Sequence, residues 1–388
     1  MPKQTKLISF LSDIAYPTKI FIVSRTILFI IAYLSLSFFS PRIGSDLSIP
    51  YPDKLYLDGW VRWDSNWYYD IAKNGYSYTP SIQIHQENIA FFPLYPYLIR
   101  YFNHLIGDYY FSGILIANIS FLLALIGLYL LISEKYTIET AQKTVLLLAF
   151  SPFSFYFSAM YSESLFLFSI VFVFFFAARK QWFLASLFAA AAGATRIVGI
   201  VSVLPILYFY MEAIRFDFRA IRWNILSVFI ACFGPMSYMA YLWVRFGNPF
   251  VFLHVYKAPG WNDDASLGAA YRTLKNIFLN LYSSNGSFGA GTIFGMKEIH
   301  LIVFLFSIFL LLAMIKKIHP AYLIWAFATI LSSFSGWVSM SRYMIVVFPL
   351  YLAAALLFHK RNFELVLAGS ACLLSMFTIL FSHWYWVS

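Results

Sequence analysis

Residues Ile20–Phe39 read IFIVSRTILFIIAYLSLSFF, an apolar run whose only charge is Arg25. A helix rises about 1.5 Å per residue, so a run of this length crosses a hydrocarbon core of roughly 30 Å. Ile225–Val244 and Ile299–Ile315 are comparable runs. The stretch therefore predicts a membrane-spanning helix, and its recurrence predicts a protein with many spans.

The composition of the whole chain agrees with this prediction. Of its 388 residues, 61% are hydrophobic and 11% are charged, whereas soluble proteins are about half apolar and a quarter charged. The net charge of +10 does not indicate nucleic acid, because Lys and Arg occur in twos and threes between apolar runs. They are typical of topology signals and of contacts with membrane lipids. We expect an all-α polytopic membrane protein with no nucleic-acid partner.

The apolar runs predict about eleven spans. They lie near residues 18–40, 109–132, 143–160, 162–178, 182–196, 197–211, 223–245, 299–315, 319–336, 341–358 and 363–384. This division puts every short basic connection on one side, which should be cytoplasmic. It also requires a bend near Thr195–Gly199, because a single crossing at 182–211 would invert all later spans.

Two long loops, about 41–108 and 246–298, then face the non-cytoplasmic side. Within the first, residues 92–107 contain two prolines and Arg100, and we expect an amphipathic helix on the outer surface. No linker, low-complexity run or clear repeat divides the chain. We therefore treat residues 1–388 as a single transmembrane domain.

The first outer loop contains Arg62-Trp63-Asp64-Ser65-Asn66-Trp67-Tyr68-Tyr69-Asp70-Ile71-Ala72. A helical spacing would place Trp60, Trp63, Asp64 and Trp67 on one face. Aromatic burial raises a carboxylate pKa toward that of a useful base, and aromatic faces stack on sugars. Asp64 is therefore a candidate base. The alternative is an interfacial helix whose Asp64 caps the helix or pairs with Arg62.

Three more carboxylates lie in outer segments, at Asp70, Glu87 and Glu163. Asp70 and Glu87 fit a second acid, a metal ligand or a solvated charge. Glu163, two residues after Tyr161, lies between two long apolar runs, where an unpaired charge costs a few kcal/mol. A carboxylate at a helix start also interacts favourably with the helix dipole, so Glu163 fits a functional or a capping role.

Arg196 and Arg342, the latter followed by Tyr343, are isolated charges at outer turns. A guanidinium group binds phosphate through two parallel hydrogen bonds, and lipid phosphates lie at this depth. The alternative is that both side chains extend to ordinary headgroups.

Several motifs are absent from the sequence. It has no Walker loop, no His-Glu-x-x-His, no cysteine pairs at zinc spacing and no Gly-x-Ser-x-Gly. Readings as an ATP-driven protein, a zinc peptidase or a serine hydrolase therefore lack support. We expect no cofactor and no metal site.

In order, RWDSNWYYDIAKNGY, ENIAFFPLYP, SPFSFYFSAMYSESLF and GATRIVG resemble the GPI mannosyltransferase II (PIG-V) family, with a weaker match at SRYMIVVFPLY (341–351). The resemblance implies a GT-C fold and inverting transfer of a sugar, mannose in family members, from a polyprenyl-phosphate donor of the dolichyl type. It implies that Asp64 is the base, that Glu163 lines the site and that Arg196 and Arg342 face the donor phosphate. Further substrate contacts are expected from Arg62, Trp63, Trp67, Asp70, Glu87, Tyr161 and Tyr343.

An outward-facing site has no access to cytoplasmic nucleotide sugars, which favours a lipid-linked donor. The acceptor would be a glycolipid or a surface glycan, and arginines would replace a metal at the leaving phosphate. The membrane would be the plasma membrane of a prokaryote or the endoplasmic reticulum of a eukaryote. The alternative function is a transporter or a flippase for glycolipids, for which mid-span charges and inverted repeats are typical.

Overall fold

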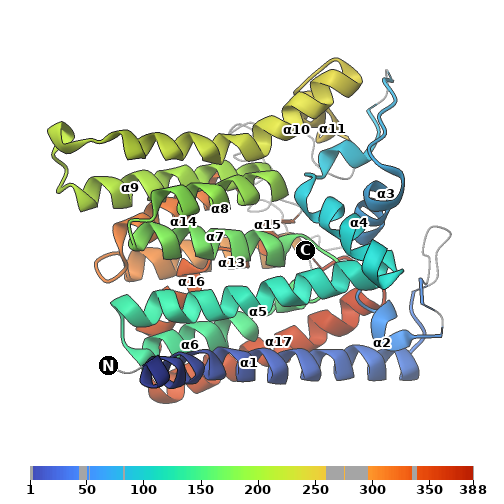
Figure 1. Ribbon diagram of the computed structural model, residues 1–388. Helices are drawn as coiled ribbons and strands as arrows, with labels where there is room; N and C mark the ends of the chain where they lie inside the picture. Colours follow the sequence, from blue (N-terminus) through green and yellow to red (C-terminus); the bar gives the residue numbers. More distant parts are fainter. Residues whose placement is uncertain are drawn as a thin grey trace.

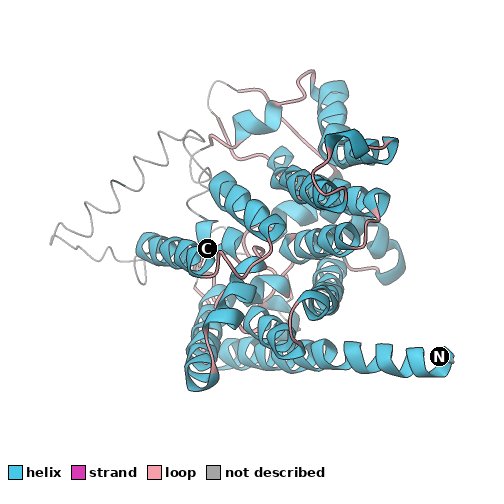
Figure 2. Ribbon diagram, turned by 90° about the vertical axis from the view of Figure 1, so that its left-hand side faces the viewer, coloured by secondary structure: helices cyan, strands magenta, loops and turns pink. Residues whose placement is uncertain are grey.

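The computed structural model describes residues 3–42, 50–51, 53–81, 84–258, 275, 296–333 and 339–387. Most of the long helices lie side by side along one direction (Figure 1), and a view turned by 90° shows many of them close to end-on, whereas the N-terminal part of the first helix runs across the others (Figure 2). Throughout these ranges the regular elements are all helices. The predicted all-α polytopic class is confirmed.

The elongated helices form the body of the bundle. They are α1 (Lys3–Phe38), α5 (Tyr109–Lys135), α6 (Ile138–Ala149), α7 (Glu163–Ala178), α8 (Trp182–Thr195), α9 (Val203–Ala213), α10 (Ile230–Phe246), α13 (Met296–Ala313), α14 (Pro320–Ser332), α16 (Pro349–Leu357) and α17 (Lys360–Ser382). The 3-10 helices η3 (Ile197–Ser202) and η5 (Trp223–Phe229) lead directly into α9 and α10. Short elements complete the chain: α2 (Leu55–Asp58), α3 (Ser65–Asn74), η1 (Asn88–Ala90), α4 (Leu94–Ile106), η2 (Ser154–Phe157), η4 (Phe218–Ala220), α11 (Val251–Val255) and α15 (Met340–Met344).

Four described helices are long and apolar enough to cross a membrane by themselves: Ile14–Phe38, Tyr109–Lys135, Trp223–Phe246 and Lys360–Ser382. Five shorter apolar helices lie beside them: Glu163–Ala178, Trp182–Thr195, Ile197–Ala213, Ile299–Ala313 and Pro320–Ser332. The chain is an integral membrane protein, and the span count of eleven stays a prediction.

The order of the helices follows the predicted alternation. The basic connections after α5, α7, α9, α13 and α16 gather at the left end of the bundle in Figure 1, and α2, α3, α4 and α11 lie at the right end. The predicted bend near Thr195–Gly199 is confirmed, because Arg196 is extended (φ −154°, ψ 138°) between α8 and η3. The predicted surface helix is α4, whose Leu105 is 86% exposed and whose Tyr95 is buried. Most of the second predicted loop, 246–298, lies outside the described residues.

Two predicted spans are wrong in detail. The stretch 143–160 is not one helix, because α6 ends at Ala149 and a buried loop with η2 continues to Ser162. Pro152 disfavours helical backbone at the residue before it, which explains this end. The stretch 341–358 divides into α15 and α16, and Pro349 begins α16, where its missing N–H costs nothing.

Arg25 of α1 supports the buried loop 150–162. Its Nη2 donates to the Ala149 carbonyl (2.7 Å) and its Nη1 to the Ser154 carbonyl (2.9 Å). Its guanidinium also lies 4.8 Å from the centre of the Phe121 ring. Non-helical backbone persists within a membrane only where the protein satisfies its polar groups. Arg25 therefore allows this loop to lie below the rim of the bundle.

We expect the loop that contains Ser81 to lie on the non-cytoplasmic side and the loop that contains Arg219 to lie in the cytoplasm. Single cysteines at these two exposed positions, in a Cys232→Ala, Cys372→Ala background, would be treated with an impermeant thiol reagent on intact cells. Ser81→Cys should label at once, and Arg219→Cys only after permeabilisation. The reverse pattern would overturn the orientation.

Candidate active site

Four charged side chains of alternating sign form a continuous series, which we call the charge chain. Arg342 Nη1 lies 2.5 Å from Asp64 Oδ2, and Arg342 Nε lies 3.3 Å from Glu163 Oε1. Arg196 Nη1 donates to the same Glu163 oxygen at 2.6 Å. Two carboxylates and two guanidinium groups thus balance in charge, and Arg342 is shared by both carboxylates.

Each member comes from a different part of the sequence. Asp64 directly precedes α3, and Glu163 is the first residue of α7, where the helix dipole favours a negative charge. Arg196 occupies the extended link between α8 and η3, and Arg342 lies in α15. The candidate site is therefore assembled by the tertiary fold and not by a local motif.

The charge chain is largely removed from water. Glu163 is 1% exposed, Arg342 7% and Asp64 8%. Burying an ion costs several kcal/mol unless it is paired, and the pairing shows that neither Arg196 nor Arg342 simply extends to headgroups. Glu163 Oε2 and Arg342 Nε have no hydrogen-bond partner within the described part of the chain. The site retains bonding capacity for a polar ligand.

Tyrosine rings surround the arginines. The Arg342 guanidinium lies 5.8, 5.5 and 5.7 Å from the ring centres of Tyr156, Tyr161 and Tyr343, and that of Arg196 lies 4.8 Å from Tyr343. Such cation–π contacts stabilise a desolvated cation. The Tyr161 hydroxyl also donates to the Arg62 carbonyl (3.1 Å) and accepts from the Asp64 N–H (3.2 Å). Tyr161 and Tyr343 therefore lie at the site, as the sequence predicts.

The glycines of GATRIVG position Arg196. A Cβ at Gly199 would lie 2.3 Å from the Ala192 carbonyl carbon, and one at Gly193 would lie 2.7 Å from Pro235 Cδ. Only glycine lets η3 fold back on α8 and lets α10 pack against α8 this closely. This close packing holds the link that carries Arg196.

The predicted helical face of Trp60, Trp63, Asp64 and Trp67 is wrong. Helix α3 begins at Ser65, and Trp63 has φ 52°, outside the helical region. Asp64 makes no capping hydrogen bond, and Arg62 pairs with Asp58 instead. Both parts of the alternative, capping and pairing with Arg62, are therefore wrong as well.

Three predicted contact residues lie in other local networks. Asp70 accepts from Asn88 Nδ2 (2.7 Å) and from Asn74 Nδ2 (2.8 Å), which ties α3 to η1. Trp67 stacks on Phe91 with ring centres 6.1 Å apart. Glu87 precedes η1 without a capping bond. The structure does not bring these side chains into the charge chain, and their substrate contacts stay predictions.

The spacing of residues along the sequence does not point to several other residues at the site. Tyr156 faces Arg342, and the buried His300 of α13 is bonded to Ser341 (Nδ1 to Oγ, 2.8 Å), next to Arg342. The Tyr68 hydroxyl is bonded to Ser162 Oγ (2.9 Å), next to Glu163. A pattern of two or three nearby residues does not reveal such pairs.

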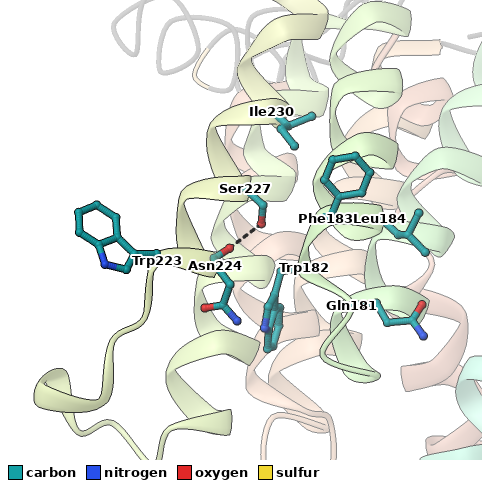
Figure 3. Close-up of a pocket in the computed structure, with 8 residues that line it drawn as sticks. All are labelled: Gln181, Trp182, Phe183, Leu184, Trp223, Asn224, Ser227 and Ile230. Atoms are coloured by element: carbon teal, nitrogen blue, oxygen red, sulfur yellow. Dashed lines mark hydrogen bonds between the residues drawn. The ribbon is translucent and has the colours of Figure 1, made fainter.

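In the described ranges, no three His, Cys, Asp or Glu side chains gather closely enough to hold a metal ion. A cavity of about 540 Å³ lies elsewhere, between the start of α8 and η5, where Trp182, Asn224 and Ser227 line it (Figure 3). Arg196 follows the other end of α8, about 20 Å away at 1.5 Å per residue. The cavity is thus separate from the charge chain.

A mannosyltransferase (PIG-V) family model matches residues 18–257. No curated protein matches the chain. The crystal structure of ArnT from Cupriavidus metallidurans bound to undecaprenyl phosphate is similar, with a TM-score of 0.51 and 16% identity over 90% of this chain and 62% of that one. The apo oligosaccharyltransferase of Archaeoglobus fulgidus has a TM-score of 0.45 and 14% identity over 97% of this chain and 56% of that one.

The likeness to ArnT shows the fold, and the chain spans 62% of the length of that protein. The predicted GT-C fold is confirmed. The family match covers more than half of the sequence, including Asp64, Glu163 and Arg196. The chain therefore belongs to the mannosyltransferase (PIG-V) family, whose members are glycosyltransferases.

Proposed function

We propose that this protein is an inverting glycosyltransferase that moves a sugar, mannose by analogy with its family, from a polyprenyl phosphate to an acceptor hydroxyl. The observation that carries the proposal is the charge chain, in which one arginine is shared by two buried carboxylates. The arrangement offers a base and a phosphate site side by side. The family match favours this enzyme over a transporter or a flippase.

The two arginines suit the leaving phosphate. Guanidinium groups bind phosphate through paired hydrogen bonds, and the similar ArnT structure contains undecaprenyl phosphate. Arg342 Nε is ion-paired with Glu163 Oε1 at 3.3 Å but makes no hydrogen bond in the described ranges, so it can still donate to a ligand. The donor would be a polyprenyl-phosphate sugar, with its chain among the membrane lipids. Arg342 and Arg196 would stabilise the negative charge that develops on the leaving phosphate.

Asp64 is better placed than Glu163 to act as the general base. Glu163 contacts both arginines and orients them. Among the described residues, Arg342 is the one cation that pairs with the Asp64 carboxylate, and it does so through Oδ2. In the proposed step, Asp64 takes the proton from the acceptor hydroxyl, and the hydroxyl oxygen bonds to the anomeric carbon. The bond from that carbon to the phosphate oxygen breaks on the opposite face, and its electron pair leaves with the phosphate.

Sharing of Arg342 couples donor binding to the base. Arg342 forms an ion pair with Asp64, with Nη1 2.5 Å from Oδ2. A donor phosphate competes for the same guanidinium and leaves Asp64 with a weaker partner. Glu163 keeps Arg196, so the site does not lose all its pairing. Asp64 is then free to contact the acceptor hydroxyl when the donor is present.

The acceptor is a hydroxyl of a glycolipid or of a surface glycan, on the non-cytoplasmic side. The membrane is the plasma membrane if the source is prokaryotic and the endoplasmic reticulum if it is eukaryotic. These assignments follow from the family and from the orientation that the basic connections predict.

The Asp64→Asn variant tests the base. The amide keeps the shape but not the basicity, so transfer should fall roughly 10²- to 10⁴-fold. The measurement is the rate of transfer from dolichyl-phosphate mannose in membranes that hold equal amounts of folded protein. Asp53→Asn, a control at an exposed outer carboxylate, should stay near the wild type. An Asp64→Asn rate within a few-fold of wild type would move the role to another carboxylate, Glu163 first.

The Arg342→Lys variant tests the phosphate site. An ammonium group is a point charge and cannot reproduce a bidentate contact. Losing a charge-assisted hydrogen bond of about 1.5–3 kcal/mol should weaken donor use roughly 10- to 150-fold. Donor dependence of transfer would be measured for Arg342→Lys and Arg196→Lys separately. Unchanged donor dependence in both variants would place the phosphate elsewhere, with Lys257 and Arg272 as the next candidates.

A further inference from the structure

Three tryptophan side chains meet beside the charge chain, and we call them the indole cluster: Trp63, Trp384 and Trp386. The Trp63 ring lies edge-on to both others, with ring centres 5.7 Å from Trp384 and 5.3 Å from Trp386. Trp63 is also the residue immediately before Asp64. Through Trp63, the cluster connects the C-terminal residues Trp384 and Trp386 to the backbone next to Asp64, the proposed base.

All three indole N–H groups of the cluster are shielded from water, and none has a hydrogen-bond partner among the residues that the structure describes. Trp384 as a whole is only 2% exposed, whereas the Trp63 and Trp386 side chains are partly exposed. A buried donor without an acceptor is costly and uncommon in folded proteins. Three such donors on rings that pack around Trp63 point to a ligand that supplies oxygen acceptors.

The backbone of the cluster is held in an unusual conformation. Trp63 has φ 52° and Trp384 has φ 66°, in the left-handed region that bulky residues rarely adopt. Such strain persists only where surrounding contacts fix it, and it concentrates at functional sites.

Arg62 supplies part of that fixation. Its Nε donates to the Ser382 carbonyl (2.9 Å), and its guanidinium lies 4.7 Å from the Trp384 ring centre. Asp58 pairs with this guanidinium, so its charge is already balanced. The predicted substrate residue Arg62 therefore acts here by positioning the indole cluster.

We propose that the indole cluster is the subsite for a sugar ring of the acceptor. The inference rests on the proposed glycosyl transfer and deepens it. Indole faces stack on the C–H surface of a sugar, and sugar hydroxyl oxygens accept from indole N–H groups. Indole N–H groups are uncharged donors, and the charge of the adjacent Arg62 is balanced by Asp58, so the cluster suits a neutral, hydroxyl-rich ring better than a phosphate. A ring bound here places its hydroxyl groups next to Asp64, while the donor phosphate occupies the arginines.

The test is ¹⁹F NMR of the purified full chain in nanodiscs, with 5-fluorotryptophan in place of tryptophan and signals assigned by single Trp→Phe variants. Methyl α-D-mannopyranoside is the sugar probe, and geranyl phosphate is the donor-side probe. The signals of the indole cluster should shift saturably with the glycoside and not with geranyl phosphate. Trp325 is the matched control. Its N–H is also buried and without a partner in the described part of the chain, but its ring lies in α14 against Phe174 and Phe348. Its signal should not move.

The Trp386→Phe variant keeps an aromatic ring and removes one N–H. It should weaken glycoside binding about threefold to tenfold, the effect of one hydrogen bond, and Trp325→Phe should leave binding unchanged. Absence of a glycoside shift up to the solubility limit, or shifts that follow geranyl phosphate instead, would overturn the assignment. The experiment measures binding and not transfer. If the protein transfers sugar but shows no such shifts, the acceptor subsite is wrong and the proposed function stands. Shifts in a chain that transfers no sugar contradict the proposed function alone.

Discussion

The buried pairing of Asp64 and Glu163 with Arg342 and Arg196 is the interaction on which the site depends. Removing one partner from such a pair leaves an uncompensated charge, which costs about 3–5 kcal/mol. The four side chains come from the start of α3, the start of α7, the end of α8 and α15, so their pairing also joins these elements. The same contacts give the site its chemistry, because Arg342 connects a candidate base to a candidate phosphate site. Stability and the proposed reaction therefore share one set of side chains.

A second constraint follows from placing this site below the rim of the bundle. The loop between α6 and α7 has to lie among apolar helices without regular hydrogen bonding, and such a loop is stable only where the protein satisfies its backbone groups. Arg25 does this with donors to the Ala149 and Ser154 carbonyls. A guanidinium group is suited to the task because it offers five donors in a fixed plane. The charge in the first apolar run thus supports the segment that leads to Glu163.

Much of the fold follows from the sequence because a membrane span needs a long apolar run and basic connections mark one side. The bend at Arg196 follows from the same alternation. The helical face predicted from local spacing is wrong at Trp63. Its left-handed backbone is held by contacts with residues near the other end of the sequence. Local spacing also gave no sign that Arg342 contacts Asp64, which lies 278 residues away. Asp64, Glu163, Arg196 and Arg342 were predicted as isolated candidates, but only tertiary structure shows them as one unit. Trp384 and Trp386 were missed because nothing nearby in sequence relates them to Trp63.

The central claim is that a donor phosphate takes Arg342 from Asp64. A cryo-electron microscopy structure of the full chain with a bound polyprenyl phosphate tests it most directly. The phosphate should lie within hydrogen-bond reach of Arg342 and Arg196, and the Arg342 to Asp64 contact, 2.5 Å in the ligand-free chain, should lengthen or break. A phosphate bound away from both arginines, with the charge chain intact, would contradict the claim.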